Sequence, residues 1–147
     1  MTDSIRQQII GKLDTRLKTI KKTANYKTDA GLHVFDWLDR DLADSELDAI
    51  IYRDRTTEIN HGLMVSYINK VRVEIEMKTK ASTGTAARLR QMLEDVCAAI
   101  NVDETWGGLA ENTEPLENSM DIQQQDKIVG SATLTIEIEY TTNKWSF

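Results

Sequence analysis

The fold is decided by two stretches, Val71–Lys78 (Val-Arg-Val-Glu-Ile-Glu-Met-Lys) and Leu134–Tyr140 (Leu-Thr-Ile-Glu-Ile-Glu-Tyr). Apolar and polar side chains alternate strictly in both, and successive side chains of a β-strand point to opposite faces of a sheet. Each stretch is therefore predicted to be a strand with one buried face and one face in water. The alternation starts early, at residue 63, so the first strand would span about 50 Å. It must bend, break near Asn69 or project as an arm beyond the domain.

Working outward, apolar residues at helical spacing predict one helix over residues 3–22 and another over residues 85–101. The other patterns predict strands at residues 32–35, 49–53, 116–123 and 132–141, and a turn at residues 54–62. Strands grouped on either side of a helix argue for a layered α+β fold. We predict a mostly antiparallel mixed sheet with two main helices packed on one face, forming a single domain over residues 1–147.

The composition is that of one soluble globular domain, with 147 residues of which 40% are hydrophobic and 29% charged. The apolar runs are too short to cross a bilayer, and the first helix has an aliphatic stripe suited to a core, so no membrane partner is expected. The first residues lack the pattern of a secretory signal, and folding in the cytoplasm is expected. Cys97 is the only cysteine, which excludes an internal disulfide, and we predict that it is buried.

Charge is distributed unevenly along a chain whose net charge is −6. Residues 1–30 sum to +4, residues 36–48 to −5, and residues 103–121 to −6 with no Lys or Arg among them. This separation argues against nucleic-acid binding by the whole surface, which needs a basic footprint. It suits head-to-tail association, in which unlike patches of neighbouring copies meet. Solvated loops and an ordinary wet helix face are the simpler explanation of any single charge run.

Residue types that carry out chemistry form no recognisable motif. His33 and His61 belong to no metal-ligand or triad-like spacing, and Gly107-Gly108 lacks the Lys-Ser/Thr pair of a phosphate loop. We expect that glycine pair to seat Trp106 against the sheet instead. No catalytic, cofactor-binding or metal-binding residue is predicted, and the chain is not expected to be an enzyme.

Four glutamates lie on the wet faces of the two alternating strands, where like charges directly opposite one another would destabilise the sheet. Either Arg72 and Lys78 separate them, or this face borders something that benefits from an acidic surface. The four are Glu74, Glu76, Glu137 and Glu139.

The order of the parts is similar to that of the tail terminator (tail tube completion) proteins of long-tailed bacteriophages. The resemblance covers nearly the whole chain: the first helix, Val34-Phe35-Asp36, Glu46–Tyr52, Val71–Ile75, the second helix and Ser131–Tyr140. The family commonly has a proline before its second strand, where this chain has Asp48.

The resemblance implies an α+β protomer that assembles as a homo-oligomeric ring of six on the end of the tail tube, ends polymerisation and offers a surface to the head. It implies no catalytic residues. The implied partners are other copies of the chain, the tail tube protein and a head-completion protein, with DNA only passing through the channel. The implied locations are the host cytoplasm during assembly and then the virion tail.

On this basis the basic first helix or the long-strand arm is predicted to meet an acidic segment of the next copy, and the four glutamates above are predicted to face the channel. The residues predicted for subunit contacts are Arg16, Lys18, Asp41, Asp44, Arg53, Arg55, Tyr67 and Trp106. A head-to-tail connector or neck protein would share size, ring assembly and absence of chemistry. A small cytoplasmic enzyme would instead show a polar pocket, with His33 or His61 near perturbed carboxylates.

Overall fold

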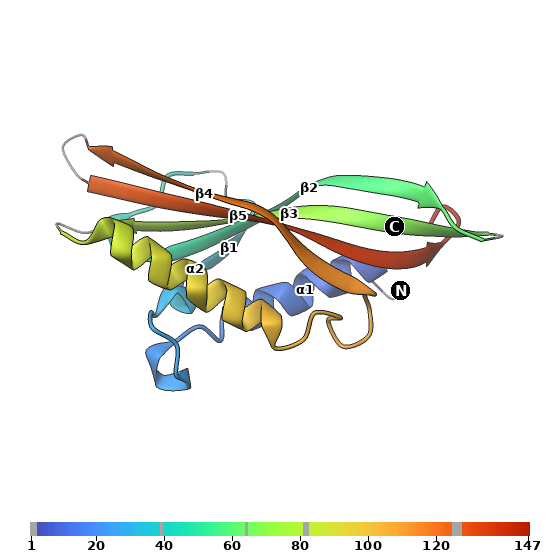
Figure 1. Cartoon of the computed structure of the whole chain (residues 1–147), viewed down its shortest axis with the longest axis horizontal. Coiled ribbons are helices and arrows are strands. Elements are labelled where there is room, and N and C mark those ends of the chain that lie inside the picture. Colours follow the sequence, from blue (N-terminus) through green and yellow to red (C-terminus); the bar gives the residue numbers. More distant parts are fainter. Residues whose placement is uncertain (1–2, 39, 64, 81–82, 125–127) are drawn as a thin grey trace.

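The two alternating stretches lie in β3 (Ser66–Lys80) and β5 (Ile128–Asn143), which pair antiparallel in the middle of a five-stranded sheet (Figure 1). The computed structural model describes residues 3–38, 40–63, 65–80, 83–124 and 128–147. The strand order is β1-β2-β3-β5-β4, in which β1 runs parallel to β2 and the other pairs are antiparallel. The other strands are β1 (Val34–Asp36), β2 (Ala49–His61) and β4 (Asn112–Gln124).

Two α-helices, α1 (Ile5–Leu17) and α2 (Thr85–Asn101), cover one face of this sheet (Figure 1). Short 3₁₀ helices at Lys22–Ala24, Ala30–Leu32 and Asp44–Glu46 lie in the connections before β2. The predicted α+β fold, with a mostly antiparallel mixed sheet and both main helices on one face, is confirmed.

The core lies between the helices and the sheet face that we call the inner face. The inner-face side chains of β3 and β5 are buried as their alternation predicts. These are Val71, Val73, Ile75, Met77, Leu134, Ile136, Ile138 and Tyr140. They pack in one cluster with Leu13 of α1 and Met92 of α2, and burying an aliphatic side chain of this size contributes about 1.5–3 kcal/mol.

Two sequence-based boundaries are wrong. The first helix ends at Leu17 rather than residue 22, because the chain turns into the 3₁₀ helix that begins at Lys22. Residues 54–61 are not a turn but the second half of β2, paired with β3 from Asp54↔Val73 to His61↔Tyr67. Cross-strand pairing outweighs the turn tendency of the segment, and the reversal begins only at Gly62, whose N–H donates to the Ser66 carbonyl (3.0 Å).

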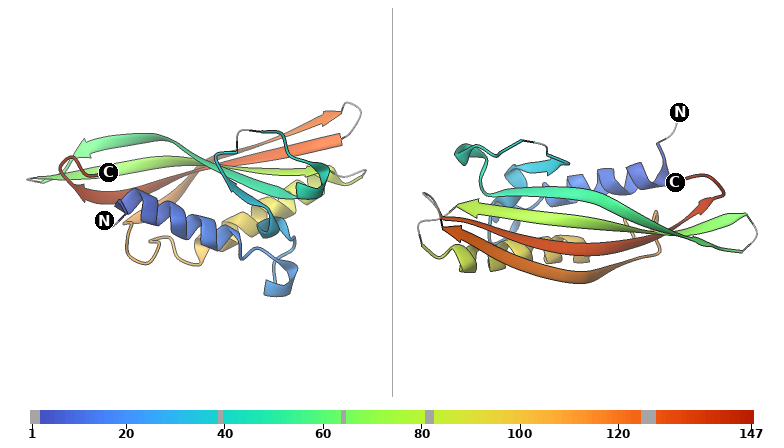
Figure 2. Two further views of the ribbon diagram at one scale, coloured as in Figure 1. Left: turned by 180° about the vertical axis from the view of Figure 1, so that it is seen from behind. Right: turned by 90° about the horizontal axis from the view of Figure 1, so that it is seen from above.

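The extra length of β3 produces an arm. The β2–β3 hairpin, with the end of β5 beside it, extends beyond both α-helices (Figures 1 and 2). We use "arm" for residues 57–61 and 66–70, together with residues 140–143 of β5. Of the three outcomes considered for the overlong strand, projection is the one observed.

Asp48, at the position where the resemblance expects proline, lies at the start of β2. Its carboxylate accepts hydrogen bonds from Arg88 Nε (2.8 Å) and from the Thr79 hydroxyl. It therefore ties the loop before β2 to both α2 and β3.

Candidate functional surfaces

The far end of the arm carries an exposed apolar cluster. Tyr67 stacks on Phe147 (ring centroids 5.9 Å apart), and His61 and Trp145 meet it edge-on at 5.5 and 6.5 Å. Trp145 is 77% exposed, and Leu63 and Val65 of the hairpin turn are 89% and 68% exposed. We call these six residues the arm tip; contiguous exposed apolar surface of this kind commonly marks an interaction site.

Beneath the tip, the inner face of the arm holds polar groups within an apolar setting. Asn69 is fully buried and donates to the Thr142 hydroxyl (2.8 Å). Among the described residues, the Tyr140 hydroxyl, Asn69 Oδ1 and Thr57 Oγ1 have no hydrogen-bond partner. Burial raises the pKa of Tyr140 above its ordinary value. These atoms contribute a desolvation cost that no hydrogen bond offsets.

The opposite, outer face of the sheet carries a ladder of ion pairs. Arg55 pairs with Glu74 (2.6 Å), Arg53 with Glu76 (3.2 Å) and Arg72 with Glu137 (3.4 Å). Glu139 lies opposite Lys70 in the β3–β5 register. Like charges are thus separated between β3 and β5 by Arg72, as the first of the two alternatives supposed, and by Lys70 rather than Lys78, which lies opposite Ser131. Three of the four predicted channel residues are paired with arginine, and two of those arginines, Arg53 and Arg55, are themselves predicted interface residues.

Carboxylates without such pairing follow β4 at the edge of the sheet. Glu114, Glu117 and Asp121 lie opposite outer-face positions of β5 in the register, and Glu114 is directly opposite Glu137. Within the described ranges, none of these three lies within 4.0 Å of a Lys, Arg or His nitrogen. We call them the β4 acidic row. The sequence signal for this row is the absence of any Lys or Arg in residues 103–121.

Trp106 must be removed from the candidate interface, because its side chain is fully buried within the chain. Its indole N–H donates to Thr113 Oγ1 (2.8 Å), and Arg16 stacks on its ring at 4.2 Å. Backbone φ angles of +54° at Trp106 and +73° at Gly107 form the turn that inserts the ring, as the glycine pair predicted. Arg16 also donates to the carbonyls of residues 100 and 103, so most of its guanidinium is used inside the protomer.

The remaining predicted interface residues lie on separate elements. Lys18 follows α1, pairs with Asp14 (2.7 Å) and is 55% exposed. Asp41 is exposed in the loop before β2, where Asp44 pairs with Lys80 (2.8 Å). Tyr67 is the centre of the arm tip. The structure does not bring these residues and the two outer-face arginines together in one element, and their contacts with a neighbouring copy stay a prediction.

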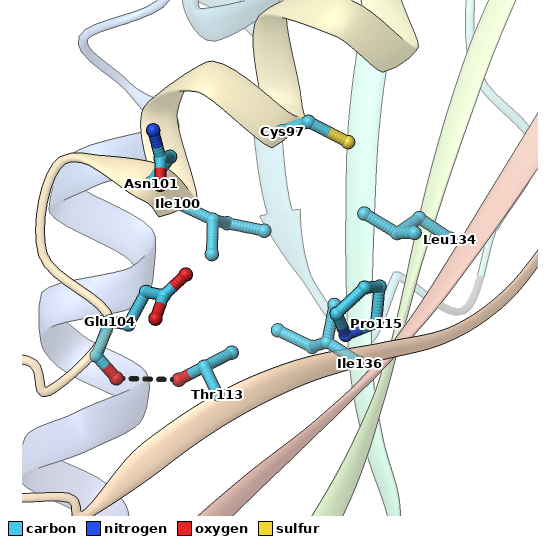
Figure 3. A pocket seen from close by; sticks show the side chains of 8 residues that line it. All are labelled: Cys97, Ile100, Asn101, Glu104, Thr113, Pro115, Leu134 and Ile136. Carbon is cyan, nitrogen blue, oxygen red and sulfur yellow. Dashed lines mark hydrogen bonds between the residues drawn. The ribbon is translucent and has the colours of Figure 1, made fainter.

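A groove on the helix side of the sheet, between α2 and β4, is lined mainly by apolar side chains (Figure 3). Cys97 and Ile100 point from α2 toward the sheet residues Pro115, Leu134 and Ile136 (Figure 3). Asn101, Glu104 and Thr113 complete the lining. We call this the α2–β4 groove.

Cys97 is exposed, which contradicts its predicted burial. The core side of α2 is formed by Leu89, Met92, Val96 and Ile100, and Cys97 lies one position beyond that stripe, at the border with β4. The partial burial that the groove provides raises the pKa of its thiol.

The two histidines lie apart from one another in the fold. His33 lines an open groove with Glu46, Lys18 and Lys21, whereas His61 belongs to the arm tip. The pKa of Glu46 is lowered to about 2, chiefly by hydrogen bonds from Arg40, which contacts both carboxylate oxygens (2.7 and 2.8 Å). The perturbed carboxylate beside His33, that of Glu46, is therefore already bound by Arg40 of the same chain.

Searches for related proteins and for metal sites gave no further assignment. No protein-family model matches the chain, and no curated protein sequence matches it. In the part of the chain that the structure describes, no group of three or more His, Cys, Asp or Glu side chains is placed to hold a metal ion. No described helix is both long and apolar enough to cross a membrane.

Proposed function

We propose that the chain is a structural protein of a bacteriophage or prophage tail, which caps the tail tube as a homo-oligomeric ring and presents the surface for head joining. The order of helices and strands supports the proposal, since it follows the pattern on which the resemblance to tail terminators rests. The ring of six copies is taken from that resemblance.

The single observation that carries the proposal is the arm. Leu63, Val65 and Trp145 are between 68% and 89% exposed at its end, although the chain has a complete core elsewhere. An apolar projection of this kind is covered when copies assemble or when the protein meets a partner. No catalytic role is assigned to any residue.

The experiment that tests tube capping uses purified tail tubes and gold-labelled protein in electron microscopy. We expect the label at one end of each tube and an arrest of further growth when free tube protein is added. The head-to-tail connector alternative predicts the reverse preference, with binding to filled heads and not to bare tubes. Label distributed along the tube walls would contradict both.

The outer face of β4 and β5 is our candidate for the channel wall. The β4 acidic row lacks basic partners within the described residues, so its field repels DNA phosphates more effectively than the arginine-paired glutamates of β3. Glu74 and Glu76, which pair with arginines, are therefore weaker candidates for the channel wall than the β4 acidic row.

Charge reversal on β4 tests the channel wall. Glu114→Lys with Glu117→Lys should leave tail length normal but lower the number of infections per assembled tail, because a basic wall holds passing phosphates. The control is Asp3→Lys with Glu94→Lys, which changes charge equally at exposed sites on the helix layer, before α1 and on α2. Equal infectivity of the two variants would exclude the β4 row from the channel.

A further inference from the structure

Two apolar features of opposite shape, an exposed projection and a groove, occur on this one chain. The arm tip projects beyond the α-helices, whereas the α2–β4 groove is recessed between a helix and the edge of the sheet (Figures 1 and 3). Cys97, Ile100, Pro115, Leu134 and Ile136 give the groove its apolar lining. Met120 and Ile122 of β4, each 38% exposed, lie on the same inner face farther along the edge strand.

The charges around these two features are complementary. Glu104 is the acidic residue in the lining of the groove. Lys144 is the basic residue at the arm tip, where its backbone is bonded to Val65 and it precedes Trp145. Unlike charge at the rim of an interface favours encounter and fixes orientation, while apolar contacts supply affinity.

Within one protomer the tip is held away from the groove. The Lys144 N–H donates to the Val65 carbonyl (2.7 Å), and Phe147 stacks on Tyr67, so residues 144–147 are fastened to the end of the arm. That end extends past the helix layer (Figures 1 and 2), whereas the groove lies between α2 and β4 (Figure 3). A tip that enters the groove would therefore belong to a second copy.

We propose that the arm tip of each copy docks in the α2–β4 groove of the next, with Trp145 as the apolar anchor and Lys144 against the acidic rim that includes Glu104. Each copy then uses two different surfaces. Such a heterologous contact generates a ring if the rotation closes. The inference rests on the proposed function, because it names the contact through which the proposed ring is built.

Cys97, the only cysteine and a lining residue of the groove, gives a direct test. Ser146→Cys places a thiol between Trp145 and Phe147 in the sequence without removing either aromatic side chain. Treatment of the assembled protein with a short bismaleimide should give a ladder of covalent oligomers on a denaturing gel. The ladder should disappear when Cys97→Ser is added. Lys22→Cys, at an exposed site outside both features, is the matched control and should remain monomeric on the gel.

A second variant removes the anchor without disturbing the core. Trp145→Ala should raise the concentration needed for assembly about tenfold or more, since aromatic anchors dominate interface energies. Its far-ultraviolet circular dichroism should be unchanged, because the side chain is 77% exposed. Cross-linking of Ser146→Cys no stronger than that of Lys22→Cys, or wild-type assembly by Trp145→Ala, would overturn the contact.

The contact and the proposed function can fail separately. A tube-capping protein that assembles without a Cys97 cross-link would retain the function and lose this interface. A clear ladder from a protein that never binds tubes would retain the interface and lose the function. Protection of Cys97 by tube protein alone, with no contact between copies, would assign the groove to the tube and contradict the inference.

Discussion

Two buried tyrosines on the inner face differ in one respect that predicts opposite effects of the same substitution. Tyr52 on β2 and Tyr140 on β5 are 2% and 0% exposed. The Tyr52 hydroxyl donates to Asp14 Oδ1 of α1 (2.9 Å), whereas the Tyr140 hydroxyl has no partner among the described residues. Replacing either with phenylalanine removes only the hydroxyl, so packing is nearly preserved.

The magnitudes follow from those contacts. A hydrogen bond to a charged group contributes about 1.5–3 kcal/mol. The Asp14 side chain is 25% exposed and also pairs with Lys18, so water and lysine partly replace the lost donor. We therefore expect Tyr52→Phe to lower the free energy of unfolding by about 1–2 kcal/mol. Tyr140→Phe removes an unmatched polar group and should raise it by up to about 1 kcal/mol.

Urea denaturation followed by tryptophan fluorescence measures both effects, with the fully buried Trp106 as the reporter of the core. The two variants should keep the same m-value and move the midpoint in opposite directions. In thermal unfolding they should differ by several degrees, at about 2–4 °C per kcal/mol for a chain of this size. Loss of stability in Tyr140→Phe as large as that in Tyr52→Phe would refute the assignment of an unpaired hydroxyl.

Three further predictions concern two separate glycines, Gly11 and Gly31, and the carboxylate of Asp103. Gly11→Ala should stabilise the protein by about 0.5–1 kcal/mol, because it lies within α1 with open space around the added methyl group. Gly31→Ala should destabilise it by about 1–3 kcal/mol, since the added Cβ would lie 2.6 Å from the carbonyl oxygens of both Leu17 and Ile20. Urea midpoints equal to that of wild type in both glycine variants would contradict these two predictions. The pKa of Asp103 is lowered from 3.8 to about 2, first by the Thr105 hydroxyl and then by backbone N–H groups of Gly107 and Thr105. Because the folded-state pKa is depressed, this carboxylate stabilises the fold above pH 3.8, and the effect is lost as the pH falls toward 2. Asp103→Asn should therefore be less stable than wild type at neutral pH and approach wild-type stability in acid. A difference in free energy of unfolding that does not narrow as the pH is lowered would contradict this prediction.

Much of the fold follows from periodicity in the sequence. The alternation around Val73 and Ile136 assigns the inner face correctly, because a two-residue period allows only one face of a strand to be apolar. The helix at residues 85–101 matches α2 for a similar reason, since one stripe of its side chains is apolar. The turn predicted at residues 54–62 is wrong because residues 54–61 form a strand only through their pairing with β3, which local sequence does not encode.

The candidate surfaces were less predictable, because they depend on register and on the borders between elements. Arg55, which pairs with Glu74, lies at the bulge where the β2–β3 register shifts, and that bulge cannot be read from the sequence. Cys97 lies one residue from the buried Val96, and whether that position is core or surface depends on how far the sheet extends past α2. Trp106, by contrast, is seated against the sheet as predicted, but its full burial contradicts its predicted role in a subunit contact.

The most direct test of tube termination is the length distribution of tails made with and without this protein, measured by electron microscopy of a phage or prophage that encodes it. We predict tails of uniform length when the protein is present and abnormally long, variable tubes without joined heads when its gene is deleted. Supplying the gene from a plasmid should restore the uniform length. Tails of normal length in the deletion strain would contradict the account, whatever the protein does in isolation.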